Sequence, residues 1–292
     1  MASTDTSDRF AIERCGACGV LRTSPVPDDL APYYATDLAA TMSHAGSPVF
    51  TALRRLQLRR ELRRIARHGD AGTFLDVGCG AGDFARVLAR RGLPVIAADA
   101  GPAAPRALSP ELAVPYLRFD FDTYEIVGLD PGGRYTVLLR HVLEHVRDPQ
   151  ACLASLRRQG ARQFYVVVPN ADSRERRLLG SDWYLWDPPR HLWHFDASSL
   201  ASLCERAGLA IVDRGLGTAP TLIPGVYRRL RLRGWPAAVY ARFGPTSLVA
   251  ALSSPLNLLV PGNVLWLVAR VADRSADAAS AGLNPSRAAA RR

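Results

Sequence analysis

The sequence predicts an α/β fold in which a doubly wound, mainly parallel sheet carries helices on both faces. Short, almost wholly apolar segments alternate with helical segments between residues 73 and 207, a pattern typical of parallel strands buried on both faces. The first of these segments runs into a glycine-rich turn, as a strand does before a ligand-binding helix. The chain has 292 residues, 48% hydrophobic and 22% charged, which suits one large domain with additions.

Before the alternating pattern, residues 1–46 read as an N-terminal arm, rich in proline and containing the pair Cys15 and Cys18. A helix is predicted over 48–68, where Leu58, Leu62 and Ile65 follow the spacing of one helical face. The core is predicted to run from residue 47 to 217.

Within the core, the apolar segments predict strands over 73–78, 94–99, 114–119, 135–140 and 163–168. Helices are predicted over 83–91, 149–159 and 198–207, the last with Asp196 or Ser198 as its cap and Gly208 as its terminator. Strands over 209–213 and 264–271 close the series. The segment 218–262 between them reads as an insertion, 263–273 as the last strand, and 274–292 as a disordered basic tail.

The formal charge is +10, and all 37 basic residues are Arg. The excess is concentrated in 54–67, 228–233 and 274–292, segments that suit either a solvated face or contact with phosphate or anionic lipid. The five cysteines are mostly scattered and the first residues lack the pattern of a secretory leader, so we expect a cytoplasmic chain with reduced thiols. The uncharged stretch 244–269 is interrupted by Pro255 and Pro261, which favours two short elements over a membrane span.

The segment Leu75-Asp-Val-Gly-Cys-Gly-Ala-Gly82 has glycines spaced for close approach of a ligand to the backbone. Asp83 stands where a dinucleotide fingerprint requires glycine, and its charge disfavours a pyrophosphate there. S-adenosylmethionine meets no such objection, because its ammonium favours a carboxylate such as Asp76. Asp99 is placed to accept ribose hydroxyls and Asp120 to accept the adenine amino group.

Together with Asp99, the segments 76–82, 141–149 and 167–170 resemble the class I S-adenosylmethionine-dependent methyltransferases. Within this class, the chain resembles the broad branch that includes ubiquinone-biosynthesis O-methyltransferases and many natural-product and sugar methyltransferases. The resemblance covers residues 47–273 and implies a Rossmann-like, seven-stranded sheet whose last strand is antiparallel. It also implies methyl transfer from S-adenosylmethionine to a small-molecule or glycan acceptor, at oxygen. No nucleic-acid partner is expected, because Asp187-Pro-Pro-Arg190 follows the fifth strand and ends in Arg, whereas the similar motif of methyltransferases of base amino groups follows the fourth strand and ends in an aromatic residue. The expected cofactor-binding residues are Asp76, Gly78, Cys79, Gly80, Gly82, Asp99, Asp120 and Arg140.

Histidines follow the fourth and fifth strands, where a base for the acceptor belongs. The catalytic candidates are His145, His191 and His141. Each has a plainer interpretation, since His145 beside Glu144 would orient its loop and His191 would fix its own. In the ubiquinone branch the segment matching 141–145 binds a divalent metal through Glu, Glu and His; here the first position is His141, so no metal is expected.

Three features leave alternatives open. Trp183, Trp186 and Trp193 are candidate walls of the acceptor site. Cys15 and Cys18 form half of a zinc ribbon, and inert thiols are the expectation. The insertion 218–262 is either an ordinary lid on the acceptor side or, through 227–260, a peripheral membrane contact for a lipid-linked acceptor. A non-catalytic relative that keeps the cofactor as a structural element is the remaining alternative, and the oligomeric state is left open.

Overall fold

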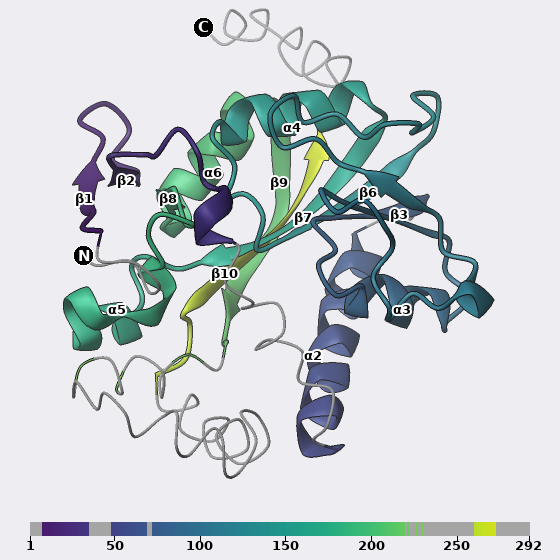
Figure 1. Cartoon of the computed structure of the whole chain (residues 1–292), viewed down its shortest axis with the longest axis horizontal. Helices are drawn as coiled ribbons and strands as arrows, with labels where there is room; N and C mark the ends of the chain where they lie inside the picture. The colour runs from purple at the N-terminus through teal and green to yellow at the C-terminus, as the bar shows by residue number, and fades with distance from the viewer. Residues whose placement is uncertain are drawn as a thin grey trace, which may run out of the picture.

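A seven-stranded sheet forms the centre of the computed structural model, which describes residues 8–34, 48–68, 72–219 and 260–272, with 221, 226 and 229. Its order is β5-β4-β3-β6-β7-β10-β9, and Figure 1 labels the strands from β3 to β9 of this order. All pairings are parallel except those of β10, which runs antiparallel to both β7 and β9. The strands are β3 (Thr73–Val77), β4 (Val95–Asp99), β5 (Tyr116–Arg118), β6 (Tyr135–Arg140), β7 (Ala161–Pro169), β9 (Leu209–Gly217) and β10 (Val264–Val271). The predicted α/β fold with an antiparallel last strand is confirmed.

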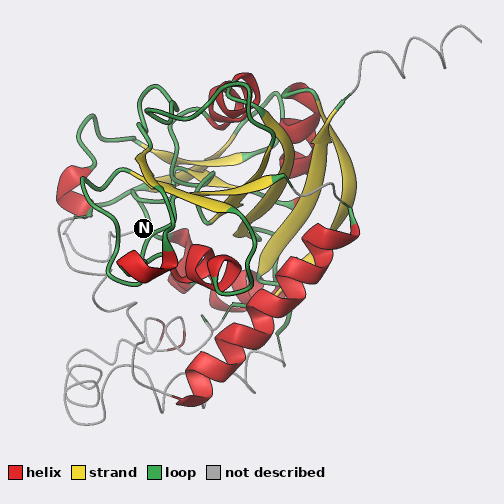
Figure 2. Ribbon diagram, turned by 90° about the vertical axis from the view of Figure 1, so that its right-hand side faces the viewer, coloured by secondary structure: helices red, strands yellow, loops and turns green. Residues whose placement is uncertain are grey.

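Helices cover both faces of this sheet, as Figure 2 shows. On one face lie α2 (Pro48–Arg67) and α3 (Asp83–Ala89), where the predicted stripe of α2 packs against β3, β4 and α3. On the other face lie α4 (Pro149–Arg158) and α6 (Ala197–Arg206), whose leucines join the larger core cluster. The doubly wound arrangement follows from strands that are apolar on both sides.

The ends of several elements follow from single residues. α4 begins after Asp148, whose side chain accepts from the backbone N–H groups of residues 150 and 151. α6 begins after Asp196, one of the two predicted caps, in a reciprocal pair with Ser199. β5 is shorter than predicted and starts after Pro115, which has no N–H to give a sheet.

The N-terminal segment forms a second sheet with the body of the domain. β1 (Ala11–Arg14) and β2 (Leu21–Ser24) make a hairpin, and β2 pairs with the two-residue strand β8 (Trp193–His194). Residues of α5 (Arg174–Leu179) and of the 3-10 turn η4 (Tyr184–Trp186) pack against this sheet. Further 3-10 turns are η1 (Ala31–Tyr33), which follows β2 in the chain, η2 (Pro110–Leu112), which lies between β4 and β5, and η3 (Gly180–Asp182), which follows α5. The prediction missed the sheet because its partners are about 170 residues apart in sequence.

Most of the insertion 218–262, including the predicted membrane contact over 227–260, lies outside the described residues, as does the tail 274–292. Those interpretations therefore stay predictions. Within the described part of the chain, no helix combines the length and the apolar character needed to cross a bilayer.

Candidate functional site

The direction of winding reverses between β3 and β6, which lie side by side at the centre of the sheet. From β3 the chain winds through β4 to the edge strand β5, and it then returns to β6 on the other side of β3. Loops that follow the carboxyl ends of strands on the two sides of such a point diverge and leave a crevice for a ligand. Here these are the glycine loop after β3 and the segment 141–148 after β6.

The glycine loop holds three residues in the left-handed region: Gly78, Gly80 and Gly82, with φ of 66°, 52° and 78°. A methyl group added at Gly78 would come within 2.6 Å of Val142, and one at Gly82 within 2.8 Å of the Leu108 side chain. A methyl group at Gly80 would meet nothing within 4 Å. Two of the glycines are therefore fixed by packing, whereas Gly80 faces open space where a ligand can lie against the backbone.

Asp99 closes this loop from the neighbouring strand. Its Oδ2 accepts a hydrogen bond of 2.7 Å from the backbone N–H of Gly80, and its Oδ1 accepts one from Ala100. The structure thus places the predicted ribose acceptor directly beside the open glycine. Asp120 lies past the next strand and uses Oδ1 to accept from the N–H groups of Asp122 and Thr123, which fixes the turn that carries it.

Asp76 lies beneath the loop and is buried, with Oδ2 accepting from the N–H of Ala85 in α3. Burial raises its pKa to about 6, an effect that the Arg140 guanidinium partly opposes. Arg140 in turn donates to Oε2 of Glu61 at 2.8 Å and lies over the ring of Phe84. Asp76 and Arg140 therefore support the glycine loop from below, and their direct contact with a cofactor stays a prediction.

Cys79 is half-buried in the same loop. Burial, together with the nearby carboxylates of Asp76 and Asp99, raises the pKa of its thiol. A thiol held in its neutral form is a poor nucleophile. Cys79 can therefore contribute a neutral surface to a bound ligand.

His145, in the segment after β6, and His191, in the loop before β8, come together although they are 46 positions apart in sequence. Their ring centroids are 4.7 Å apart in an edge-to-face arrangement. Nδ1 of His145 lies 3.0 Å from the carbonyl of Arg190, and Nδ1 of His191 lies 2.8 Å from the carbonyl of Leu185. A carbonyl only accepts hydrogen bonds, so Nδ1 is the donor in both rings and Nε2 of each neutral ring keeps its lone pair. Burial and the neighbouring His191 lower the pKa of His145 to about 4.

Glu144 lies against both rings and is completely buried. Its Oε1 is 3.1 Å from Nδ1 of His141, whereas its Oε2 has no hydrogen-bond partner within the described part of the chain. The imidazole of His141, in hydrogen-bond contact, holds the pKa of this carboxyl below its usual value despite burial. The backbone carbonyl of Glu144 accepts from Leu192 and Trp193, which brings the His191 loop to this point.

The N-terminal segment supports the histidines from outside. The hydroxyl of Thr23 donates to the carbonyl of His191 at 2.6 Å, and its N–H donates to Leu192. The hydroxyl of Tyr34 lies 3.0 Å from Nδ1 of His145. Two segments that the sequence does not relate thus meet at the candidate acceptor site.

The remaining candidates lie elsewhere. His141 is exposed, with a left-handed backbone, and reaches the other histidines only through Glu144. Trp183 is fully buried and packs edge-to-face on Trp186 in a core cluster, so its interpretation as a wall of an open site is wrong. His194 is buried between Thr23 and Trp186.

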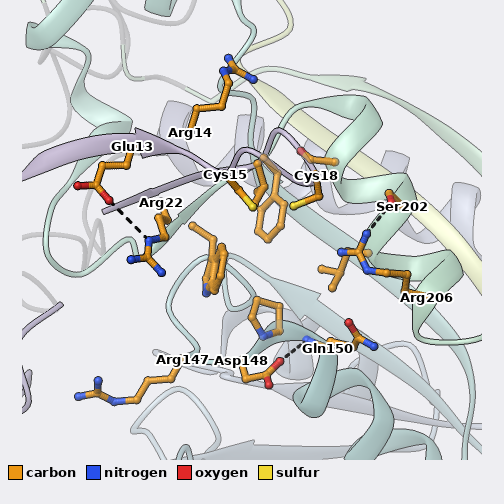
Figure 3. A pocket seen from close by; sticks show the side chains of 16 residues that line it. Glu13, Arg14, Cys15, Cys18, Arg22, Arg147, Asp148, Gln150, Ser202 and Arg206 are labelled. Atoms are coloured by element: carbon orange, nitrogen blue, oxygen red, sulfur yellow. Dashed lines mark hydrogen bonds and ion pairs between the residues drawn. The ribbon is translucent and has the colours of Figure 1, made fainter. Parts of the chain in front are cut away.

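A hollow of about 510 Å³ lies between the N-terminal hairpin and the helices α4 and α6 (Figure 3). Trp193 lines this hollow, and both hairpin thiols, Cys15 and Cys18, lie at its edge. The backbone N–H groups of Cys18 and Ala17 both donate to the sulfur of Cys15, and these hydrogen bonds, the one from Cys18 most, lower the pKa of the Cys15 thiol. No third histidine, cysteine or carboxylate joins the two thiols as a metal ligand among the described residues.

A family model described as a methyltransferase domain matches residues 50–214, more than half of the chain. The chain belongs to this methyltransferase family. A ubiquinone biosynthesis O-methyltransferase of Cereibacter sphaeroides is 32% identical over 155 residues, which cover 48% of this chain and 61% of that protein. The ubiquinone biosynthesis O-methyltransferase of Paracidovorax citrulli is 28% identical over 159 residues, which cover 50% of this chain and 67% of that protein. The chain thus matches less than two thirds of the length of its first relative.

Among solved structures, the chain is similar to the 1,6-didemethyltoxoflavin-N1-methyltransferase of Burkholderia thailandensis, which was crystallised with 1,6-didemethyltoxoflavin and S-adenosylhomocysteine. The TM-score is 0.50 at 17% sequence identity, and the alignment covers 94% of the present chain and 100% of the Burkholderia chain. This likeness supports the fold.

Sequence reasoning missed two residues of the site region. Glu61 had a signal, because it is the single acidic residue in the arginine-rich run 54–67 and falls on the same helical face as Leu58, Leu62 and Ile65. Tyr34 had none, since its approach to His145 depends on the path of the N-terminal segment across the domain.

Proposed function

We propose that the chain is an S-adenosylmethionine-dependent methyltransferase that acts on a small-molecule or glycan acceptor at an oxygen atom. The observation that carries the proposal is Gly80, which presents open backbone at the switch point beside the carboxylate of Asp99. The residues fit the cofactor, because an adenosine ribose can lie along this loop and share the carboxylate with the N–H of Gly80. The methyltransferase family match over 50–214 supports the same conclusion.

In this proposal Gly78, Gly80 and Gly82 shape the loop, Asp99 and Asp120 hold the nucleoside, and Asp76 and Arg140 support the loop from below. The cofactor supplies an electrophilic methyl group. The protein then has to align the acceptor oxygen with that group and receive its proton. The hydrogen bonds of His145 and His191 support this role, because Nδ1 of each donates to a backbone carbonyl and the lone pair of the neutral ring is then on Nε2.

The test is calorimetric titration of the full chain with S-adenosylmethionine and with S-adenosylhomocysteine. We expect micromolar binding that is lost in Gly80→Arg, whose side chain would fill the open space beside the loop. The matched control is Gly92→Arg. Gly92 also has a left-handed backbone with open space beside it, but it follows the C-terminal end of α3, away from the glycine loop. Absence of binding to both ligands by a folded protein would refute the proposed activity.

A further inference from the structure

Acceptor atoms converge on one point of the candidate site. Glu144, His145 and His191 can each offer one ligand atom so that all three lie within 4.8 Å of one another. Two metal bonds of about 2.1 Å at a tetrahedral angle place their ligand atoms about 3.4 Å apart. The three ligand atoms would therefore have to move closer by at most about 1.4 Å to bind one cation. His145 is only partly buried, so its side chain can make such a movement.

The hydrogen bonds of His145 and His191 resemble those that orient metal-binding histidines in proteins. A metal-binding histidine usually donates its other ring N–H to a carbonyl or carboxylate, which fixes the tautomer and the ring orientation. Both rings do so here, toward the carbonyls of Arg190 and Leu185. Glu144 is completely buried, with one oxygen toward His141 and the other without a partner among the described residues.

A buried, unpaired carboxylate oxygen is costly unless a cation or a donor satisfies it. Besides His141, which contacts Oε1 of Glu144, the carboxylate of Asp187 lies close to the three, with its Oδ2 3.9 Å from Nε2 of His191. Both oxygens of Asp187 accept from Arg190. Asp187 therefore adds negative charge, and its arginine is already engaged. The centre needs positive charge that these groups do not provide.

We propose that Glu144, His145 and His191 bind one divalent transition-metal cation, such as Zn²⁺ or Fe²⁺, through a carboxylate oxygen and two imidazole nitrogens. Two imidazoles with one carboxylate suit such cations better than Mg²⁺ or Ca²⁺, which favour oxygen ligands. Three protein ligands leave a coordination position open for a water or an acceptor oxygen. With the cation bound, these two imidazoles would not take the acceptor's proton, and the cation would instead lower the pKa of an acceptor hydroxyl at the open position. That role rests on the proposed methyl transfer, whereas the binding of the cation does not.

This ligand set differs from the one that the resemblance implies. There, the residue at position 141 is a ligand; here, His141 is exposed and contacts the opposite oxygen of Glu144. His191 takes its place from a separate loop, which Thr23 and Glu144 hold against the site through backbone hydrogen bonds.

The experiment uses the full chain carrying Cys15→Ser and Cys18→Ser, so that the hairpin thiols cannot contribute to metal binding. The protein is stripped with a chelator, and Zn²⁺ is added by calorimetry and Co²⁺ by visible absorption. We expect one equivalent of either cation and, for Co²⁺, a spectrum with nitrogen ligands.

Three variants and two controls identify the ligands. His191→Asn and His145→Asn keep a donor for the backbone carbonyl but remove Nε2, and Glu144→Gln keeps a partner for His141. Each should weaken binding by more than the roughly 10–100-fold that loss of an outer partner costs. His141→Gln should stay below about 10-fold, and His68→Ala, at the other end of the sheet beside Asp213, should not change the affinity.

Binding that survives His191→Asn but is lost in His141→Gln would overturn the proposal in favour of the other ligand set. Absence of any bound cation would overturn it too, provided that the protein unfolds cooperatively. Titration with S-adenosylhomocysteine in parallel separates the two proposals. A chain that binds the cation but not the nucleoside refutes only the methyl transfer, and the converse refutes only the metal site.

Discussion

Asp76→Asn should make the protein more stable at neutral pH. The Asp76 carboxyl is buried beneath α3, and burial raises its pKa from 3.8 to about 6 in the folded state. An acid whose pKa is raised by folding binds more protons in the folded than in the unfolded chain between those two values. The free energy of unfolding therefore falls as the pH rises from about 4 to about 6, and the full penalty remains above that range.

The size of the penalty follows from the same two values. The difference between 3.8 and about 6 corresponds to about 3 kcal/mol at pH 7. Asparagine has no charge to desolvate, and its amide oxygen can still accept from the N–H of Ala85. Its amide N–H groups need acceptors of their own, so the expected gain is about 1–3 kcal/mol.

Urea unfolding at pH values from 4 to 8 measures this directly. The wild type should lose stability relative to Asp76→Asn across the interval between about 4 and 6, and the two curves should run parallel above it. Asp122→Asn, an exposed aspartate at the same edge of the sheet, is the control and should track the wild type. A constant difference between wild type and Asp76→Asn at every pH, or a less stable variant at pH 7, would refute the assignment of a raised pKa.

Three further predictions concern single contacts. Glu61→Ala should lower the free energy of unfolding by about 3 kcal/mol, because it leaves the Arg140 guanidinium buried without its ion-pair partner; chemical denaturation checks this, and a change below 1 kcal/mol would contradict it. Gly80→Ala should lower the free energy of unfolding by only about 1–2 kcal/mol, whereas Gly78→Ala should lower it more because its methyl group also clashes with Val142. Equal losses of stability for the two variants in thermal unfolding would contradict this difference in packing. Trp183→Ala should cost about 3–5 kcal/mol while leaving S-adenosylhomocysteine affinity unchanged in calorimetry, because the side chain is buried in a separate core cluster.

Periodicity and caps were enough to predict the strands and helices around the main sheet, whereas the antiparallel direction of its last strand came from the family resemblance. Leu58, Leu62 and Ile65 repeat at helical spacing, and all three are buried as a helix face should be. Asp196 shows its capping role in the sequence because an apolar helical face starts just after it. Such signals involve residues a few positions apart, so one sequence contains them.

The orientation of Asp76 was also available in principle. Side chains alternate along a strand, so Asp76 and Phe74 share the face of β3 that packs against α2 and α3. A carboxylate on a strand face that helices cover is expected to be buried away from solvent. The sequence interpretation attended to the glycines that follow and did not predict this burial, while its assignment of Asp76 to the cofactor stays a prediction.

Contacts between distant segments were not available. The bond from Thr23 to the carbonyl of His191 joins residues 168 positions apart, and Tyr34 and His145 are 111 positions apart. Strand β8 has only two residues, too few for an alternating pattern to appear. A one-residue shift in how the N-terminal hairpin lies would move these contacts, and no local pattern specifies that position.

The two halves of the proposed site, one proposed for the cofactor and one for the acceptor, therefore differ in how the sequence specifies them. The cofactor half is built from consecutive strand ends, β3, β4 and β5, whose glycines and carboxylates follow one another within about 45 residues and are positioned by the sheet itself. The acceptor half combines three segments, the N-terminal hairpin, the loop after β6 and the loop before α6, held by backbone hydrogen bonds from Thr23 and Glu144. Changes in the N-terminal segment can reshape the acceptor half while the glycine loop keeps its geometry. This separation explains why the sequence indicates the cofactor much more closely than the acceptor.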